Sequence, residues 1–156
     1  MKSVLVAGIG NVFLGDDGFG VAVANRLARE HLPEEVRVVD YGIRSVHLAF
    51  ELFDAPDLLV LVDATARGGA PGTLYVIEPD EDDIDRAVQG ADAHSMDPVA
   101  VLGTVKRVTG SLPRTRIVGC EPMGIEEGME LSKPVEAAIE PAIAMIRRLV
   151  EKERST

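Results

Sequence analysis

The stretch KSVLVAGIGNVFLGDDGFG, residues 2–20, decides the fold class of this chain. A short apolar run, Val4 to Ala7, leads into a loop rich in Gly, Asn and Asp, and an apolar helical pattern begins near Gly18. A buried strand, a tight polar loop and a helix in that order open a parallel α/β domain. Ligands of such domains bind beyond the carboxyl ends of the strands, so the loop with Asp16 and Asp17 is the first candidate for a site.

The nearest generic motif is the dinucleotide fingerprint GxGxxG, of which Gly8 and Gly10 supply the first half. The third glycine would fall at position 13, which is Phe13, and that glycine normally lets the helix pack closely under a bound pyrophosphate. Asp16 and Asp17, just before the helix, would also repel phosphates. A nucleotide-binding or small-ligand-binding α/β domain is therefore the weakest interpretation.

Composition limits the classes of partner. With 156 residues the chain is sized for one domain, and its 16 Lys and Arg against 26 Asp and Glu give a net charge of -10. This charge argues against nucleic acid or an anionic membrane as the main partner. The single cysteine, Cys120, excludes an internal disulfide and a cysteine-rich zinc site, and we interpret it as a buried apolar filler.

Targeting segments are not expected. The first strand begins at residue 3, and its apolar run is too short for a secretory signal. No run approaches the ~20 consecutive apolar residues of a membrane-spanning helix. We therefore expect a cytoplasmic protein.

Four further apolar runs predict the rest of a sheet. LLVLV, the most hydrophobic, predicts a central strand buried on both faces, and the run before Pro79 predicts an antiparallel edge strand. The runs are Val36 to Val39, Leu58 to Val62, Thr73 to Ile77 and Arg116 to Gly119. The expected fold is a single-domain α/β three-layer sandwich over residues 1–156, with a twisted, mostly parallel five-stranded sheet and helices on both faces.

Several helix boundaries can be read from the chain. Ser45 is a candidate N-cap, and Asp97 and Pro98 form a typical N-cap and first helical residue. The acidic tract 79–92 predicts a solvated loop or a short exposed helix. Pro141 should kink or split the closing helix.

Acidic residues follow three of the predicted strands. Asp16 and Asp17 follow the first, Asp40 the second and Asp63 the central one, and in a parallel sheet these ends share one edge. Two carboxylates and an imidazole such as His94 can hold a divalent cation of intermediate hardness, such as nickel, zinc or manganese. The alternative is that each Asp caps the helix or turn that follows it.

The motif GIGNVFLGDDGFG resembles the opening signature of the hydrogenase maturation proteases, which trim the C-terminal tail of the nickel-iron hydrogenase large subunit. The resemblance covers nearly the whole chain. It continues through Asp40-Tyr41-Gly42, LLVLVDA followed by Pro71-Gly72-Thr73, His94 and VEAAIEPAI.

The resemblance implies that Asp17, Asp63 and His94 bind nickel. The family often has Glu at the first of these positions, and Asp17 is one methylene shorter. Many relatives also have an Asp-Gly-Gly turn where this chain has Tyr41 in the middle. The nickel would already be inserted in the large-subunit precursor, so the protease recognises a completed site; other divalent metals can take its place in vitro.

The chain offers no Ser-His-Asp arrangement, no HExxH motif and no catalytic cysteine pattern. Hydrolysis through a polarised carbonyl and an activated water is the available route, an aspartic-type endopeptidase with Asp17 or Asp16 as the base. We otherwise interpret Asp16 as a supporting residue or helix cap, and Asp40 as a residue that binds the basic tail or forms a turn.

The remaining candidates shape these loops. Asn11 should order the first loop, and Gly8, Gly10 and Gly18 should allow backbone geometries closed to other residues. Gly42 completes the turn after the second strand. A catalytically silent nickel-binding maturation chaperone would need the same three ligands, and only cleavage separates it from a protease.

Overall fold

The computed structural model describes residues 2–90, 97–128 and 130–156. Its strands form one sheet in the order β2-β1-β3-β5-β4. They are β1 (Val4–Ile9), β2 (Val36–Gly42), β3 (Leu58–Ala64), β4 (Leu74–Ile77) and β5 (Thr115–Cys120). β4 runs antiparallel to β5 at one edge, and the other pairs are parallel, which confirms the predicted sheet and its antiparallel edge strand.

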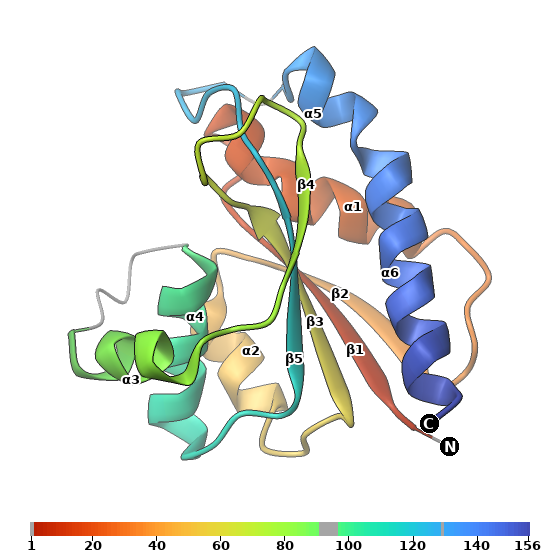
Figure 1. The fold of residues 1–156 in the computed structure, drawn as a ribbon, viewed down its shortest axis with the longest axis vertical. Helices are drawn as coiled ribbons and strands as arrows, with labels where there is room; N and C mark the ends of the chain where they lie inside the picture. Colours follow the sequence, from red (N-terminus) through yellow and green to blue (C-terminus); the bar gives the residue numbers. More distant parts are fainter. Residues whose placement is uncertain (1, 91–96, 129) are drawn as a thin grey trace.

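Helices cover both faces of this sheet, as the three-layer prediction required (Figure 1). α1 and α6 pack on one face, and α2, α3 and α4 on the other. The helical segments are the 3-10 turn η1 (Gly15–Gly18), α1 (Phe19–Leu27), α2 (Ser45–Glu51), α3 (Glu81–Gly90), α4 (Pro98–Thr109), α5 (Lys133–Ala137) and α6 (Ile139–Arg154). Within the described ranges, none of these helices has the length and apolar content needed to cross a bilayer.

The central strand β3 separates two apolar cores. Val60 and Val62 point into the core under α1 and α6, whereas Leu59 and Leu61 point into the core under α2 and α4. A parallel strand buried on both faces must be apolar at every position, which explains the run LLVLV. Cys120 is also fully buried, and burial raises the pKa of its thiol to about 12, consistent with its interpretation as an apolar filler.

The strand order creates a switch point between β1 and β3. β1 pairs with β2 on one side and with β3 on the other, so the connections after β1 and β3 leave the sheet beside each other. In α/β sheets this crevice, beyond the carboxyl ends of the strands, is the usual ligand site. The fold therefore brings the loop after β1 and the end of β3 together.

Of the two predicted helix N-caps, one is confirmed and the other is wrong. Asp97 is the N-cap of α4 and accepts hydrogen bonds from Val99 N (2.9 Å) and Ala100 N (3.4 Å), as predicted. The cap assigned to Ser45 is wrong. Ser45 is the first residue of α2, and Arg44 holds the N-cap position without a side-chain cap bond.

The two remaining helical predictions are confirmed. The acidic tract forms the exposed helix α3. The closing helix is split into α5 and α6 at Ala138, three residues before Pro141. Pro141 has no N–H to donate to the carbonyl of Ala137, so a continuous helix would lose a hydrogen bond there.

Candidate metal and catalytic site

The loop after β1 is shaped by Gly10 and Asn11. Gly10 has a φ of 136°, and a Cβ at this position would lie 1.9 Å from the carbonyl oxygen of Asp17, so only glycine fits. The backbone N–H of Asn11 donates to Asp17 Oδ2 at 2.9 Å, and Asn11 Oδ1 accepts from Phe13 N at 2.9 Å. These contacts hold the Asp17 side chain at the carboxyl end of β1.

The other two loop glycines act differently from the prediction. Neither Gly8 nor Gly18 has a positive φ, so the expectation of unusual backbone geometry is wrong for both. Close packing limits the space for a side chain instead, most strictly at Gly8. A Cβ at Gly8 would lie 2.3 Å from Gly20 O in α1, and one at Gly18 would lie 3.1 Å from Val12 Cα.

Asp63, at the end of β3, is the most unusual acid in the described part of the chain. It is 0 % exposed. Its Oδ1 accepts from Ala64 N at 2.8 Å, while its Oδ2 is buried and has no hydrogen-bond partner among the described residues. Burial raises the pKa of Asp63 well above its ordinary value, and the neighbouring charges of Asp17 and Asp97 raise it further. A buried carboxylate oxygen without a hydrogen-bond partner is stabilised when it binds a proton or a cation.

Asp17 lies in the same crevice and shares this electrostatic environment. It is partly buried, and burial raises its pKa, although the N–H of Asn11 partly offsets the effect. A Cβ at Gly10 would lie against both the backbone of Asp17 and, at 3.4 Å, Asp63 Oδ1. The structure therefore brings two of the three predicted nickel ligands to one edge of the sheet.

His94 lies outside the described residues. Asp97, three residues later in the sequence, is described, and its charge acts on Asp63, so the N-terminus of α4 lies on the same edge of the sheet. Within ranges 2–90, 97–128 and 130–156, no three His, Cys, Asp or Glu residues are grouped as a metal site.

Asp16 has a different environment from its neighbour. It is 1 % exposed, and its carboxylate accepts four hydrogen bonds from the segment after β5. The donors are Met123 N (2.8 Å), Gly124 N (3.1 Å), Ser132 N (2.7 Å) and Ser132 Oγ (2.8 Å). Burial raises the pKa of Asp16, but these hydrogen bonds outweigh it and leave the pKa lowered. Asp16 makes no cap bond to η1 or α1, so the helix-cap interpretation is wrong for this residue.

Asp40 and Gly42 lie on the wall of a groove beside this site. The groove has a volume of about 320 Å³, and Gly10 and Asn11 are among its lining residues. Its lining also includes Val12, Phe13, Val21, Asp40, Gly42, Ile43 and Arg44. Gly42 has a φ of 54°, and its carbonyl accepts from Gly10 N at 2.9 Å, so the turns after β1 and β2 are joined.

Tyr41, the residue that departs from the family's turn, points away from the groove. Its ring is buried in the core under α2, and its hydroxyl donates to Glu51 Oε2 at 2.5 Å. The backbone carbonyl of Tyr41 accepts from Arg44 Nε at 3.0 Å. Tyr41 therefore adds no side chain to the lining of the groove.

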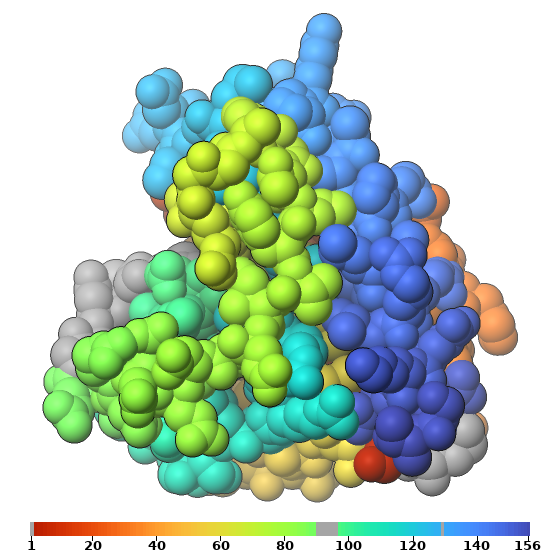
Figure 2. Space-filling view, viewed as in Figure 1, coloured from red at the N-terminus to blue at the C-terminus, as the bar shows by residue number. Residues whose placement is uncertain are grey.

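Glu121 is a buried acid that the sequence analysis did not identify as a candidate. It is 6 % exposed and follows β5, and its Oε1 accepts from Arg67 N (2.7 Å), Gly69 N (3.0 Å) and Tyr75 Oη (2.7 Å). It therefore braces the loop that follows Asp63. Figure 2 shows the light-blue segment after β5 beside the yellow-green loop after β3. The signal that could have identified Glu121 is its position directly after a predicted strand, like that of Asp63.

The comparisons with known proteins identify the family. The sequence model of the family described as hydrogenase maturation protease matches residues 21–149. This chain belongs to the hydrogenase maturation protease family. It is 36% identical to the hydrogenase expression/formation protein HupM of Azotobacter chroococcum over 146 residues, which are 92% of this chain and 69% of that protein.

Solved structures of hydrogenase maturation proteases share its fold. The hydrogenase maturating endopeptidase HybD from Escherichia coli superposes with a TM-score of 0.79 at 28% identity, over 96% of this chain and 93% of HybD. The hydrogenase 2 maturation peptidase from a Thaumarchaeota archaeon gives 0.73 at 31% identity, over 96% and 99% of the two chains. The family establishes a peptidase of hydrogenase maturation.

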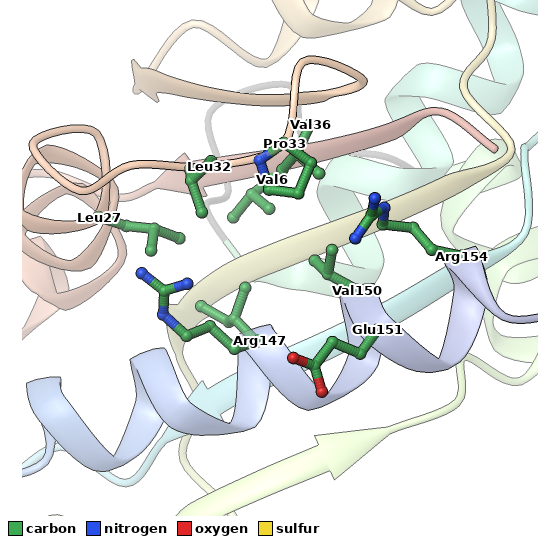
Figure 3. Close-up of a pocket in the computed structure, with 10 residues that line it drawn as sticks. Val6, Leu27, Leu32, Pro33, Val36, Arg147, Val150, Glu151 and Arg154 are labelled. Carbon is green, nitrogen blue, oxygen red and sulfur yellow. The ribbon is translucent and has the colours of Figure 1, made fainter. Parts of the chain in front are cut away.

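A second hollow in this maturation protease lies away from the Asp17–Asp63 edge. It is an apolar cavity of about 90 Å³ between α6 and the connection from α1 to β2 (Figure 3). Two arginines on α6 close its rim by pairing with glutamates of that connection, Arg147 with Glu30 and Arg154 with Glu35. These pairs fasten α6 to the connection.

Proposed function

We propose that this chain is the endopeptidase that removes the C-terminal extension of a nickel-loaded nickel-iron hydrogenase large-subunit precursor. The observation that carries the proposal is the fully buried Asp63, whose Oδ2 lacks a partner among the described residues, beside the charge of Asp17. Family membership supplies the reaction class, since the matched family consists of hydrogenase maturation proteases.

The nickel belongs to the precursor and is part of the substrate. We propose Asp17, Asp63 and His94 as the residues that bind it. Carboxylate and imidazole donors suit nickel and similar divalent cations. A cation between Asp17 and Asp63 would also remove the cost of holding two carboxylates together in a buried crevice, which supports binding of a charged group there.

We propose Asp17 as the general base. Burial raises its pKa above the ordinary value, which makes its carboxylate a stronger base than a solvated aspartate. Asp17 would take a proton from the water that attacks the scissile carbonyl, and the proton would pass to the amine that leaves when the C–N bond breaks. Asp16 is a poor candidate for this role because its carboxylate is occupied by four hydrogen bonds and its pKa is lowered.

The experiment is the mass of the cognate precursor before and after incubation with this protein, in a nickel-loaded and a nickel-free form. Loss of a short C-terminal peptide from the nickel-loaded form alone would support both the cleavage and the nickel check. Cleavage of both forms equally would remove nickel recognition from the proposal. Intact mass in both forms would remove the cleavage itself.

A nickel-binding maturation chaperone without catalytic activity is the second candidate. The same buried pair, Asp17 and Asp63, favours it, because metal binding alone would use these carboxylates. Binding of the nickel-loaded precursor without any change in its mass would favour the chaperone.

A further inference from the structure

Exposed apolar side chains gather along α2, which lies beside α4 on the sheet face opposite α1 and α6 (Figure 1). Ile43, Val46, Phe50 and Phe53 are 62%, 46%, 62% and 61% exposed, and we call these four residues the α2 stripe. Val46 and Phe50, four residues apart, lie on one side of the helix, and Ile43 and Phe53 lie in the turns before and after it. The opposite side of α2 is buried through Leu48 and Ala49, so the four residues of the stripe are not part of the hydrophobic core.

The stripe is continuous with the groove that lies beside the candidate site. Ile43 belongs to both, since it lines the groove together with Phe13, which is itself 62% exposed. Gly10 and Asn11 also line the groove, and the N–H of Asn11 holds Asp17. The groove and the stripe therefore form one continuous surface beside the loop that carries Asp17.

The charges around the stripe differ from those of the whole chain. The chain carries a net charge of -10, whereas around the stripe the basic side chains Arg37 and Arg44 are offset by the acids Asp40, Glu51 and Asp54, with His47 beside them. Arg37 and His47 both contact Glu51, which also accepts from Tyr41, so the acid on α2 is compensated. The hollow on the other side of η1 is lined instead by acids, Glu126, Glu127 and Glu130. An apolar partner surface without a large net charge therefore fits α2 better than that hollow.

The size of the groove limits what it can hold. A volume of about 320 Å³ accommodates a few residues of an extended tail. Specific protein–protein contacts bury roughly 1,200–2,000 Å² in total, so a stable enzyme–precursor complex needs a second contact area. Contiguous exposed apolar surface next to the groove is the natural place for that area.

We propose that the α2 stripe docks the folded body of the large-subunit precursor while the precursor's tail lies in the groove. This inference rests on the proposed peptidase function. It assigns a separate role to residues that touch neither the metal edge nor the scissile bond. A second copy of this chain is the competing occupant.

The test compares the double variant V46S/F50S with Val76→Ser. Val76, on edge strand β4, is 46% exposed like Val46 but lies outside the stripe. With the nickel-loaded precursor as substrate, V46S/F50S should raise KM about tenfold or more and leave kcat within about twofold, because buried apolar anchors dominate docking energy. Val76→Ser should change neither value. Thermal unfolding confirms that each variant is folded.

Binding of the purified precursor, measured by biolayer interferometry, gives a readout that needs no cleavage. Weaker binding of the precursor to V46S/F50S than to the wild type supports the docking proposal even if the mass assay finds no cleavage. An unchanged KM and unchanged binding in V46S/F50S would overturn it. So would analytical ultracentrifugation that finds a dimer of this chain in the wild type and a monomer in V46S/F50S, which would assign the stripe to self-association.

Discussion

Asp16 and Asp17 are adjacent in the chain, yet their carboxylates have opposite environments. Asp16 accepts four hydrogen bonds from the segment after β5 and has a lowered pKa. Asp17 accepts one, from Asn11, and has a raised pKa. Successive residues of the 3-10 turn η1 point in different directions, so one acid fixes the loop and the other faces the crevice.

Asp16→Asn should destabilise the fold. Asparagine replaces one accepting oxygen by an NH₂ group, which then opposes the backbone donors of Met123 and Gly124. We expect the free energy of unfolding to fall by about 3 kcal/mol and the Tm by roughly 6–12 °C. Thermal unfolding followed by circular dichroism measures this, and equal stability of the variant and the wild type would contradict the bracing role.

The difference in Tm between the wild type and Asp16→Asn should depend on pH. Because the folded-state pKa of Asp16 is lowered, its contribution to stability is present above its ordinary value of 3.8 and is lost as the pH falls through the folded pKa. The Tm difference between the wild type and Asp16→Asn should therefore shrink below about pH 4. A difference that stays constant down to pH 2 would assign the effect to packing.

Asp17→Asn should strongly slow cleavage and, like Asp63→Asn, should not lower the stability of the metal-free protein, because the pKa of Asp17 is raised in the folded state. Loss of a general base lowers kcat by roughly 10²–10⁴-fold. Asp17→Glu should keep measurable activity, because a carboxylate remains, and the exposed Asp54→Asn removes the same charge as a control. The readout is the rate of tail loss from the nickel-loaded precursor, and a normal rate in Asp17→Asn would remove Asp17 as the base.

Asp63→Asn should make the metal-free protein more stable while it loses precursor cleavage. The folded-state pKa of Asp63 is raised by burial and by Asp17. Its contribution to stability is therefore present below its ordinary pKa and is lost as the pH rises through the folded pKa. At neutral pH the variant should gain about 2–4 °C in Tm for each kcal/mol of relieved charge burial.

The gain from Asp63→Asn should decline as the pH is lowered toward 4, because Asp63 itself then becomes neutral in the folded state. Calorimetry in the presence of a chelator measures both values without interference from metal binding. A Tm below that of the wild type at neutral pH would contradict the strained state assigned to Asp63.

The sequence predicted the sheet because its signals are local. LLVLV is typical of a strand buried on both faces, and the apolar runs around it predict the layers, as the structure confirms. The acid at the end of that strand, Asp63, was found in the same way. Patterns of this kind need no knowledge of distant contacts.

The supporting contacts could not be predicted because they join distant parts of the chain. Asp16 is held by residues 107 to 116 positions later, and Glu121 accepts from a loop more than 50 positions earlier. No local pattern encodes such pairs. The Tyr41 side chain, by contrast, follows the alternation of β2, which places it with Val39 in the core under α2, where its hydroxyl donates to Glu51.

Gly20 should tolerate no side chain, because α1 touches the sheet there. A Cβ at Gly20 would lie 2.1 Å from Val62 O and 2.4 Å from Ile9 O, and backbone atoms of β3 and β1 cannot move aside as a side chain can. Gly20→Ala should therefore lower the free energy of unfolding by about 3 kcal/mol or more. It should also slow precursor cleavage, since α1 follows directly after Asp17 and must shift away from the sheet.

Gly124→Ala is the matched control, because a Cβ there meets nothing within 4 Å, and it should leave stability unchanged or slightly raised. Urea unfolding of both variants measures the difference, and equal midpoints would show that α1 does not depend on this close contact.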